Sequence, residues 1–244
     1  MIKIRNLQKE FNRRPVLKRV DLDIPKGQTM VVIGKSGCGK TVLLKSIIGL
    51  IKPDGGQLLV DGHDVVRMKR GELFEMRKKF GMLFQGAALF DSMTVEENVG
   101  LSLREHTQLT PEAIRRKVEE KLEWVGLPNI LGKKPSELSG GMKKRVGLAR
   151  ALAMEPAYML YDEPTTGLDP ITADTINRLI VDMNRKLDIT AVAVTHDMDS
   201  AKIIGDRVAM LHEGSVYFEG SVDTFNKSKD PVVRRFREGN LEEE

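Results

Sequence analysis

Gly34-Lys35-Ser36-Gly37-Cys38-Gly39-Lys40-Thr41 is the stretch that decides the fold of this chain. It follows an apolar run, Thr29–Ile33, typical of a buried strand, and it precedes Val42–Leu50, where apolar residues recur at helical spacing. Strand, glycine-rich loop and helix are the context of a phosphate-binding loop, whereas a flexible Gly/Ser turn needs neither flank. We therefore predict a triphosphate site in which Lys40 contacts the outer phosphates and the Thr41 hydroxyl binds Mg²⁺.

The composition limits the class of protein. The chain has 244 residues, of which 41% are hydrophobic and 30% charged, as in a soluble globular protein. It contains no apolar run of about 20 residues, and its start lacks a signal-peptide core, so we expect a cytosolic product. The one cysteine, Cys38, excludes an internal disulfide, and no His/Cys cluster indicates zinc. A net charge of +4 is mild and fits an ordinary solvated surface.

Strands and helices alternate along most of the chain. Strands are expected at 2–7, 20–24, 29–33, 57–60, 80–84, 158–161, 190–195, 207–212 and 215–219. Helices are expected at 111–125, with Thr110 as the cap, and at 142–154, 170–187 and 197–204. This order predicts an α/β fold with a mainly parallel core sheet, and the paired strands near both ends predict an antiparallel β subdomain. We expect a domain at 1–222, with a subdomain at about 94–155 that is helical throughout, and a tail at 223–244 that is a docking helix or disordered.

A magnesium–triphosphate site needs a carboxylate at the end of a buried strand. Asp162 follows such a strand and is the predicted metal ligand, and the adjacent Glu163 is the predicted general base for an attacking water. An ordinary acidic turn before Pro164 is the alternative that the phosphate loop disfavours.

Two further polar residues follow predicted strands. His196 comes directly after 190–195, where an imidazole can bond a γ-phosphate oxygen or the attacking water, although a structural histidine fits equally well. Gln85 follows 80–84 and can contact Mg²⁺ or water, although a solvated glutamine is the commoner case.

A second anion-binding helix start is predicted at Leu138-Ser139-Gly140-Gly141-Met142. Ser139 can cap a helix that is rich in basic residues, and the plain alternative is a cap with a solvated basic face. One chain thus carries two phosphate-binding devices. If two chains pair head to tail, each nucleotide can be held by the loop of one chain and the Ser139 helix of the other.

In order along the chain, these motifs resemble those of the ATP-binding cassette (ABC) family. Gly34–Thr41 is similar to the Walker A loop, Gln85 to the Q-loop and Leu138–Met142 to the signature motif. Met159–Glu163 is similar to the Walker B strand, Gly167–Asp169 to the D-loop, and His196 to the switch histidine. The resemblance covers nearly the whole chain and implies a P-loop NTPase fold of the ABC ATPase type.

The family implies roles for these residues. ATP would lie against Phe11, Val16, Gly34, Lys35, Ser36, Gly37, Cys38, Gly39, Lys40, Thr41 and Val42 of one chain, and against Ser139, Gly140 and Gly141 of the other. Phe11 would stack on adenine, although the bare sequence favours a core position for it. Thr41, Gln85 and Asp162 would hold Mg²⁺. Glu163 would activate water, His196 would sense the γ-phosphate, and Asp169 would couple the two sites.

The signature departs from the commonest one, because Met142 stands where most relatives have Gln. That residue, its continuation to 145 and the stretch 81–99 closely resemble the ATPases of Mla/Mce phospholipid-transport systems, most of all the MlaF type. Such ATPases sit at the cytoplasmic face of the inner membrane on an MlaE-type permease, often with a STAS-domain protein and an MCE-domain lipid-binding protein. The tail 230–236 resembles a segment that packs on the neighbouring subunit.

In this family, the permease docks on the region after Gln85, which in this chain carries apolar side chains. They suit either a docking groove or a buried helical corner, and they are Ala87, Ala88, Leu89, Phe90 and Met93.

Other functions stay open at this stage. An ABC ATPase for another substrate, such as an amino acid or an organic solvent, carries the same motifs. A soluble ABC ATPase acting on DNA or ribosomes is disfavoured, because the chain has one signature motif and no heptad array, so we expect no nucleic-acid partner. A GTPase is disfavoured because no Asn-Lys-x-Asp motif occurs.

Overall fold

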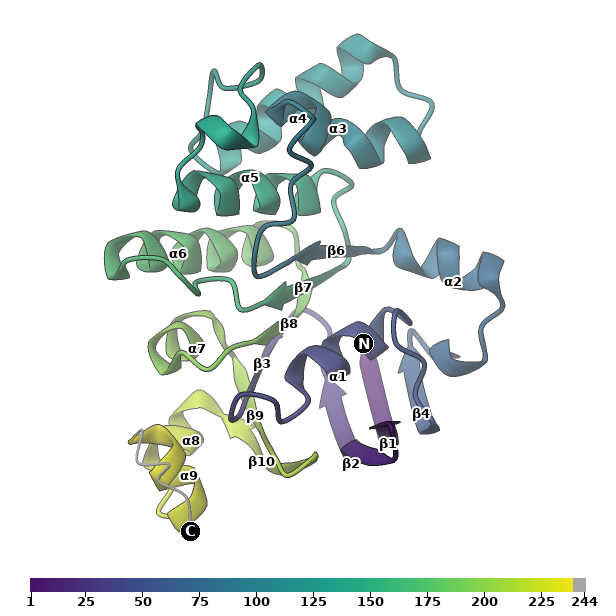
Figure 1. The fold of residues 1–244 in the computed structure, drawn as a ribbon, viewed down its shortest axis with the longest axis vertical. Helices are drawn as coiled ribbons and strands as arrows, with labels where there is room; N and C mark the ends of the chain where they lie inside the picture. The colour runs from purple at the N-terminus through teal and green to yellow at the C-terminus, as the bar shows by residue number, and fades with distance from the viewer. Residues whose placement is uncertain (239–244) are drawn as a thin grey trace. The chain divides into compact units, whose positions relative to one another are not determined.

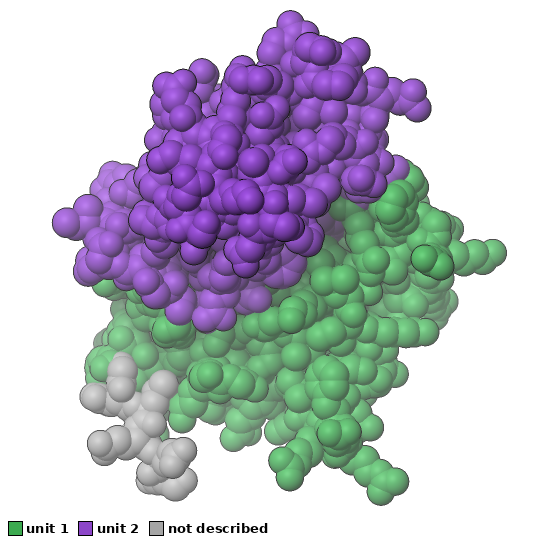
Figure 2. All heavy atoms as spheres, turned by 45° about the horizontal axis from the view of Figure 1, so that its top comes forward, with its two compact units in different colours: residues 1–77, 190–244 green, residues 78–189 purple. Residues whose placement is uncertain are grey.

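The computed structural model describes residues 1–238 and divides the chain into two compact units (Figure 2). Unit 1 comprises residues 1–77 and the chain from 190 onward, and unit 2 comprises residues 78–189. The predicted domain limits, 1–222 and 223–244, therefore stay a prediction. Among residues 1–238, no helix is both long and apolar enough to cross a bilayer.

Unit 1 is built on a mixed sheet (Figure 1). Its strands are β1 (Ile2–Phe11), β2 (Arg14–Ile24), β3 (Thr29–Ile33), β4 (Gly55–Val60), β5 (His63–Asp64), β8 (Thr190–Val194), β9 (Arg207–His212) and β10 (Ser215–Ser221), in the order β5-β4-β1-β2-β10-β9-β3-β8. β3 pairs in parallel with β8 and β9, while β1, β2, β4 and β5 form antiparallel pairs. All five residues of β3 and of β8 are buried, as expected for parallel strands covered on both faces.

The helices of unit 1 are short. They are α1 (Lys40–Ile47), α2 (Arg70–Arg77), α7 (Met198–Ile204), α8 (Val222–Lys227) and α9 (Pro231–Arg237), with a 3₁₀ turn at Val65–Arg67. Asp230 caps α9 by accepting bonds from two backbone N–H groups, and Val233 and Phe236 are buried. The described part of the predicted tail thus contains two short helices joined by the irregular residues 228–230, and its last part, 239–244, lies outside the described residues.

Unit 2 pairs two parallel strands, β6 (Phe80–Leu83) and β7 (Tyr158–Asp162), with four α-helices (Figure 1). These helices are α3 (Val95–His106), α4 (Pro111–Trp124), α5 (Gly140–Leu152) and α6 (Pro170–Lys186). Capping residues set the starts: Thr94 forms a capping box with Glu97, and Thr110 and Asp169 each precede a proline at the first helical position.

The block 94–155 is not helical throughout, which corrects the sequence expectation. Residues 107–110 and most of 125–139 are turns or irregular, with a short 3₁₀ turn at Pro135–Glu137. The reason is local, since Thr107 and Val125 end their helices and Gly126 has a positive φ of 68°.

Candidate functional site

The glycine-rich loop Gly34–Thr41 leaves the end of β3 and enters α1. Gly34 has a φ of 156°, and a Cβ there would lie 2.4 Å from the carbonyl oxygen of Leu211. Gly39 has a φ of 105°, and a Cβ there would lie 2.8 Å from a methyl carbon of Leu17. Because a side chain would collide at both positions, only glycine lets the backbone follow this path.

Lys40 opens α1 and is only 8% exposed. Its Nζ donates to the carbonyl oxygen of Gly34 at 2.7 Å and to that of Lys35 at 3.1 Å. Gly39 caps the helix without a side-chain hydrogen bond. A buried ammonium beside a helix start that has no side-chain cap is an arrangement that attracts an anion.

The other loop residues differ in exposure. Lys35, Ser36 and Gly37 are exposed, while Cys38 and Val42 are partly buried. Burial raises the pKa of the Cys38 thiol, which keeps this side chain protonated.

The structure brings His196 to the edge of unit 1 that carries the phosphate loop. Val194 of β8 lies opposite Val32 of β3, and the Thr195 N–H donates to the Val32 carbonyl at 3.2 Å. The chain therefore leaves both parallel strands at one edge, with the loop after β3 and the exposed His196 after β8.

Val16 and Phe11 belong to unit 1 as well. A methyl carbon of Val16 lies 3.2 Å from the place where a Cβ of Gly39 would stand, so Val16 is beside the loop. Phe11 ends β1 and is 43% exposed, with the Lys9 ammonium 5.2 Å from its ring centroid. The core position that the bare sequence favoured for Phe11 is therefore wrong, because the strand end leaves its ring in solvent.

A second edge, in unit 2, carries the predicted metal and base residues. β6 and β7 are parallel, with Leu83 opposite Tyr161. Asp162 is 7% exposed at the end of β7, and Gln85 is exposed two residues beyond Leu83. The sequence thus located both residues at one edge of this strand pair.

Glu163 is held at its side chain and at its main chain. Its φ is 49°, which is uncommon for a residue other than glycine. The Thr166 hydroxyl donates to its Oε2 at 3.1 Å, and the Lys144 ammonium donates to its carbonyl oxygen at 3.1 Å. These bonds fix the direction in which the carboxylate points.

Lys144 is a neighbour of Glu163 that the sequence motifs did not indicate. It is 4% exposed, and burial lowers its pKa to about 8 against the opposing effect of the Glu163 and Asp162 charges. A signal was present: Lys144 precedes the buried Leu148 and Leu152 by four and eight residues. That spacing puts all three on the inner face of α5.

The second predicted anion-binding start lies at the surface of unit 2. Ser139 caps α5 by accepting a bond from the Met142 N–H at 3.3 Å. Ser139 and Gly140 are both exposed, so the helix start is open to an incoming group. A Cβ on Gly141 would lie 2.5 Å from a methyl carbon of Thr172.

Asp169 lies close to the start of α5, because Thr172 contacts both. It accepts the Thr172 hydroxyl at 2.6 Å and the Thr172 N–H at 3.0 Å. The hydroxyl bond is the main reason that the pKa of Asp169 is lowered. The D-loop carboxylate and the Ser139 helix start are therefore packed together within unit 2.

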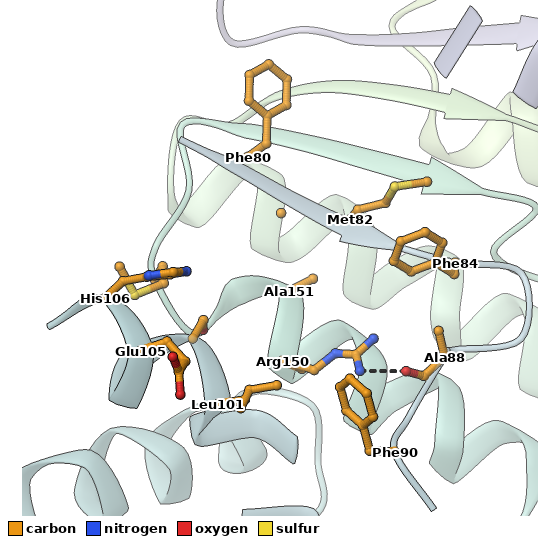
Figure 3. Close-up of a pocket in the computed structure, with 13 residues that line it drawn as sticks. Phe80, Met82, Phe84, Ala88, Phe90, Leu101, Glu105, His106, Arg150 and Ala151 are labelled. Carbon is orange, nitrogen blue, oxygen red and sulfur yellow. Dashed lines mark hydrogen bonds between the residues drawn. The ribbon is translucent and has the colours of Figure 1, made fainter. Parts of the chain in front are cut away.

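Unit 2 also contains a cavity of about 540 Å³ (Figure 3). Much of its wall is apolar, including Phe80, Met82, Phe84, Phe90, Leu101 and Met154. Of the residues predicted for a docking groove, Ala88 and Phe90 line it, whereas Ala87 is 1% exposed. The apolar stretch after Gln85 is thus partly groove and partly core.

Residues 17–166 match the ABC transporter family. The probable ribonucleotide transport ATP-binding protein mkl of Mycobacterium leprae is 43% identical over 98% of this chain and 69% of its own length. The intermembrane phospholipid transport system ATP-binding protein MlaF of Escherichia coli is 40% identical over 98% of this chain and 89% of its own length.

Solved structures agree with the fold. A dimeric post-hydrolysis state of the ATP-binding cassette MJ0796, bound to ADP and Pi, has a TM-score of 0.84 and 34% identity over 91% of this chain and 99% of that chain. CbiO1 of Clostridium perfringens, part of an ABC transporter complex, has a TM-score of 0.85 and 30% identity over 98% of this chain and 97% of that chain. The chain belongs to the ABC transporter family, has its P-loop ATPase fold, and is an ATP-binding and ATP-hydrolysing subunit.

Proposed function

We propose that this chain powers a transporter that moves phospholipids between membranes, working as a head-to-tail dimer that drives a permease. One observation carries the dimeric mechanism. The chain presents two separate helix starts that can bind an anion: the start of α1 at Lys40 and the exposed start of α5 at Ser139. A single triphosphate does not require both. In a head-to-tail pair, each would complete the nucleotide site of the other chain.

The phosphate loop would hold the β- and γ-phosphates through its N–H groups and Lys40. The exposed Phe11 ring would stack on adenine, with Val16 packing beside the loop. Glu163, held by Thr166 and Lys144, would take a proton from the attacking water. His196 would bond the γ-phosphate and so report whether it is still attached.

Magnesium fits the donors that these residues offer. Among the described residues, no group of three or more His, Cys, Asp and Glu side chains forms a metal cluster. Mg²⁺ prefers hard oxygen ligands, and phosphates and water can supply part of its coordination. The protein would supply the hydroxyl of Thr41, the amide oxygen of Gln85 and the carboxylate of Asp162. Bound there, the ion would neutralise charge on the phosphates during transfer.

The partner would be an integral-membrane permease of the MlaE type, with a STAS-domain protein and an MCE-domain lipid-binding protein as further components. The cavity beside Ala88 and Phe90 supports this, because its apolar wall suits a short helix from such a permease. ABC ATPases work as dimers with a membrane permease, which would keep this chain at the cytoplasmic face of the inner membrane.

The names of the relatives leave two substrate classes. MlaF is named for phospholipid transport and mkl for ribonucleotide transport. We favour phospholipid because the stretch 81–99 and the Met142 signature resemble the Mla/Mce ATPases.

The variant Glu163→Gln tests the mechanism. It keeps the shape of the side chain but removes the base, so ATP turnover should fall by about 10²-fold or more, and light scattering should detect an ATP-bound dimer. Glu213→Gln is the matched control, because Glu213 is an exposed glutamate with a φ of 47° at the β9–β10 turn. Unchanged turnover in Glu163→Gln would refute the assigned base.

The substrate is tested on the intact complex purified from native membranes. Reconstituted into vesicles, it should move labelled phospholipid in an ATP-dependent manner, and the complex that carries Glu163→Gln should not. ATP-dependent uptake of a labelled ribonucleotide with no lipid movement would replace phospholipid as the substrate.

A further inference from the structure

The turn that follows Gln85 has a backbone conformation that its residues disfavour. Ala87 and Ala88 have φ values of 59° and 49°, both in the left-handed region. In that region the Cβ of an L-residue crowds its own backbone, and residues other than glycine normally occur there singly. Two alanines in succession therefore need support from their surroundings.

Arg150 of α5 provides that support. Its guanidinium donates to the carbonyl oxygen of Ala87 at 2.8 Å and to that of Ala88 at 2.7 Å, and Figure 3 shows it reaching from α5 to the loop. The planar fork of arginine suits two neighbouring acceptors, which a lysine cannot bind in the same way. Arg150 is partly buried, and this burial lowers the pKa of its guanidinium.

The helix that carries Arg150 also packs closely against the turn. A Cβ added to Gly147, one turn earlier on α5, would lie 3.1 Å from the Cβ of Ala87. The Ala87 N–H donates to the Phe84 carbonyl at 2.9 Å, which closes the turn around Gln85. The conformation of Gln85 is therefore tied to the two bonds from Arg150.

The chain on either side of this turn is held by other contacts. Upstream, Leu83 lies opposite Tyr161 in the β6–β7 pair. Downstream, Asn98 is fully buried, accepts a bond from the Phe90 N–H at 2.8 Å and donates to the Phe90 carbonyl at 3.1 Å. Between these two anchored points, the Arg150 fork fixes the path that the chain takes past Gln85.

We propose that Arg150 is a positioning residue for Gln85: it holds the Ala87–Ala88 turn left-handed and so presents the Gln85 amide to the metal. This rests on the proposed function, which assigns Gln85 to Mg²⁺. Loss of the fork lets the turn relax and displaces the amide, while the phosphate loop keeps its own contacts. Arg150 therefore governs the Mg²⁺ dependence of hydrolysis more than the binding of the nucleotide itself.

Arg150→Lys keeps the charge and removes the fork. We expect the Mg²⁺ concentration for half-maximal ATPase activity to rise by about 10-fold, the range typical for a residue that orients a metal ligand, with metal-free ATP affinity unchanged. Arg145→Lys is the matched control, since Arg145 on the same helix donates to the carbonyls of Val125 and Gly126 in another loop. It should leave the Mg²⁺ dependence within twofold of the wild type.

Glycine should rescue the defect. Gly pays no Cβ penalty at positive φ, so Ala88→Gly in the Arg150→Lys background should return the Mg²⁺ half-saturation toward the wild-type value. Ala88→Val, made with Arg150 intact, should reproduce the defect, because a β-branched side chain is strained at this φ. This variant keeps the proposal testable if changes at Arg150 prevent folding.

Amide hydrogen exchange over residues 84–90 provides a readout without nucleotide. Exchange should speed up in Arg150→Lys and slow again in the glycine double variant, because the Ala87 N–H is bonded within the turn. Unchanged Mg²⁺ dependence in Arg150→Lys, or no recovery with glycine, would overturn the proposal. A wild-type protein without Mg²⁺-dependent ATPase would instead contradict the proposed function, whatever the exchange shows.

Discussion

Lys40 of unit 1 and Lys121 of unit 2 are both buried, and the two differ in how the protein compensates a charge removed from water. Lys40 in unit 1 is 8% exposed and donates to the neutral carbonyls of Gly34 and Lys35. Lys121 in unit 2 is fully buried, pairs with the carboxylate of Glu155 at 2.8 Å, and lies 3.5 Å from the ring centroid of Trp124.

The difference separates the proposed phosphate site from a structural contact. A buried cation is costly unless an anion compensates it. Lys121 has that anion within its own chain, whereas the bonds of Lys40 go to uncharged oxygens that a phosphate can supplement. Burial alone therefore does not distinguish Lys40 from Lys121, whereas the charge of their partners does.

The largest effect is expected at Lys40. Lys40→Met should lower ATP turnover by about 10²-fold or more, because the donor that we propose for the transferring phosphate is lost. The melting temperature should change little, because an unpaired neutral carbonyl destabilises the folded state less than an unpaired carboxylate would. Lys45→Met, on the same helix, is the control in a steady-state ATPase assay. Wild-type turnover in Lys40→Met would remove the distinction between the two lysines.

The next effect concerns stability. Glu155→Gln removes the nearer of two carboxylates that pair with the buried Lys121 ammonium, leaving Glu120 at 3.2 Å, and should lower the free energy of unfolding by about 1–2 kcal/mol. Lys121→Met should cost less than Glu155→Gln, because a partly exposed carboxylate can return to water. Urea titrations measure both, and ATP turnover should be unaffected in each. The reverse order of costs would contradict the account of Lys121 as a compensated charge.

A pH effect follows from the same pair. The hydrogen bond from Lys121 is the main reason that the pKa of Glu155 lies below its usual 4.5. A carboxyl with a lowered pKa in the folded state stabilises fully above pH 4.5, and this contribution is lost as the pH falls through the folded-state value. The difference in melting temperature between the wild type and Glu155→Gln should therefore shrink below pH 4.5. A constant difference down to acid pH would show that the charge of Glu155 does not matter.

The smallest effect is expected at an exposed ion pair. Arg178 and Asp174 on α6 are 2.7 Å apart, but their side chains are 74% and 43% exposed. Water already solvates both charges and salt screens their attraction, so Arg178→Met should leave the melting temperature unchanged at ordinary ionic strength. A clear loss there would show that surface pairs matter here as much as buried ones.

The sequence alone predicted several elements closely, although the helix after the phosphate loop, expected over 42–50, is α1 at Lys40–Ile47. The strand at Thr29–Ile33 has the predicted limits, and the predicted helix that begins at Asp169 has its cap there and ends at Lys186. These signals are readable because strand periodicity, proline and capping residues act within a few positions of the chain. The ABC family followed from the same short motifs in their order.

The sequence was less informative where local signals are weak. It missed α2 (Arg70–Arg77), which has few apolar residues, and it left the tail open although α8 and α9 form there. It also favoured a core position for Phe11, which is exposed. Burial of a single aromatic residue depends on which segments cover it.

The sequence by itself determined the nucleotide chemistry of this protein, because phosphate-binding loops, helix caps and strand-end carboxylates are local features. Only the tertiary structure decided which charges support that chemistry. Lys144 reaches the carbonyl of a residue 19 positions away, and Arg150 reaches that of Ala87 across 63. Such contacts arise from the packing of α5 against distant loops, and although spacing along α5 indicates that Lys144 faces inward, it does not identify the residue that Lys144 contacts.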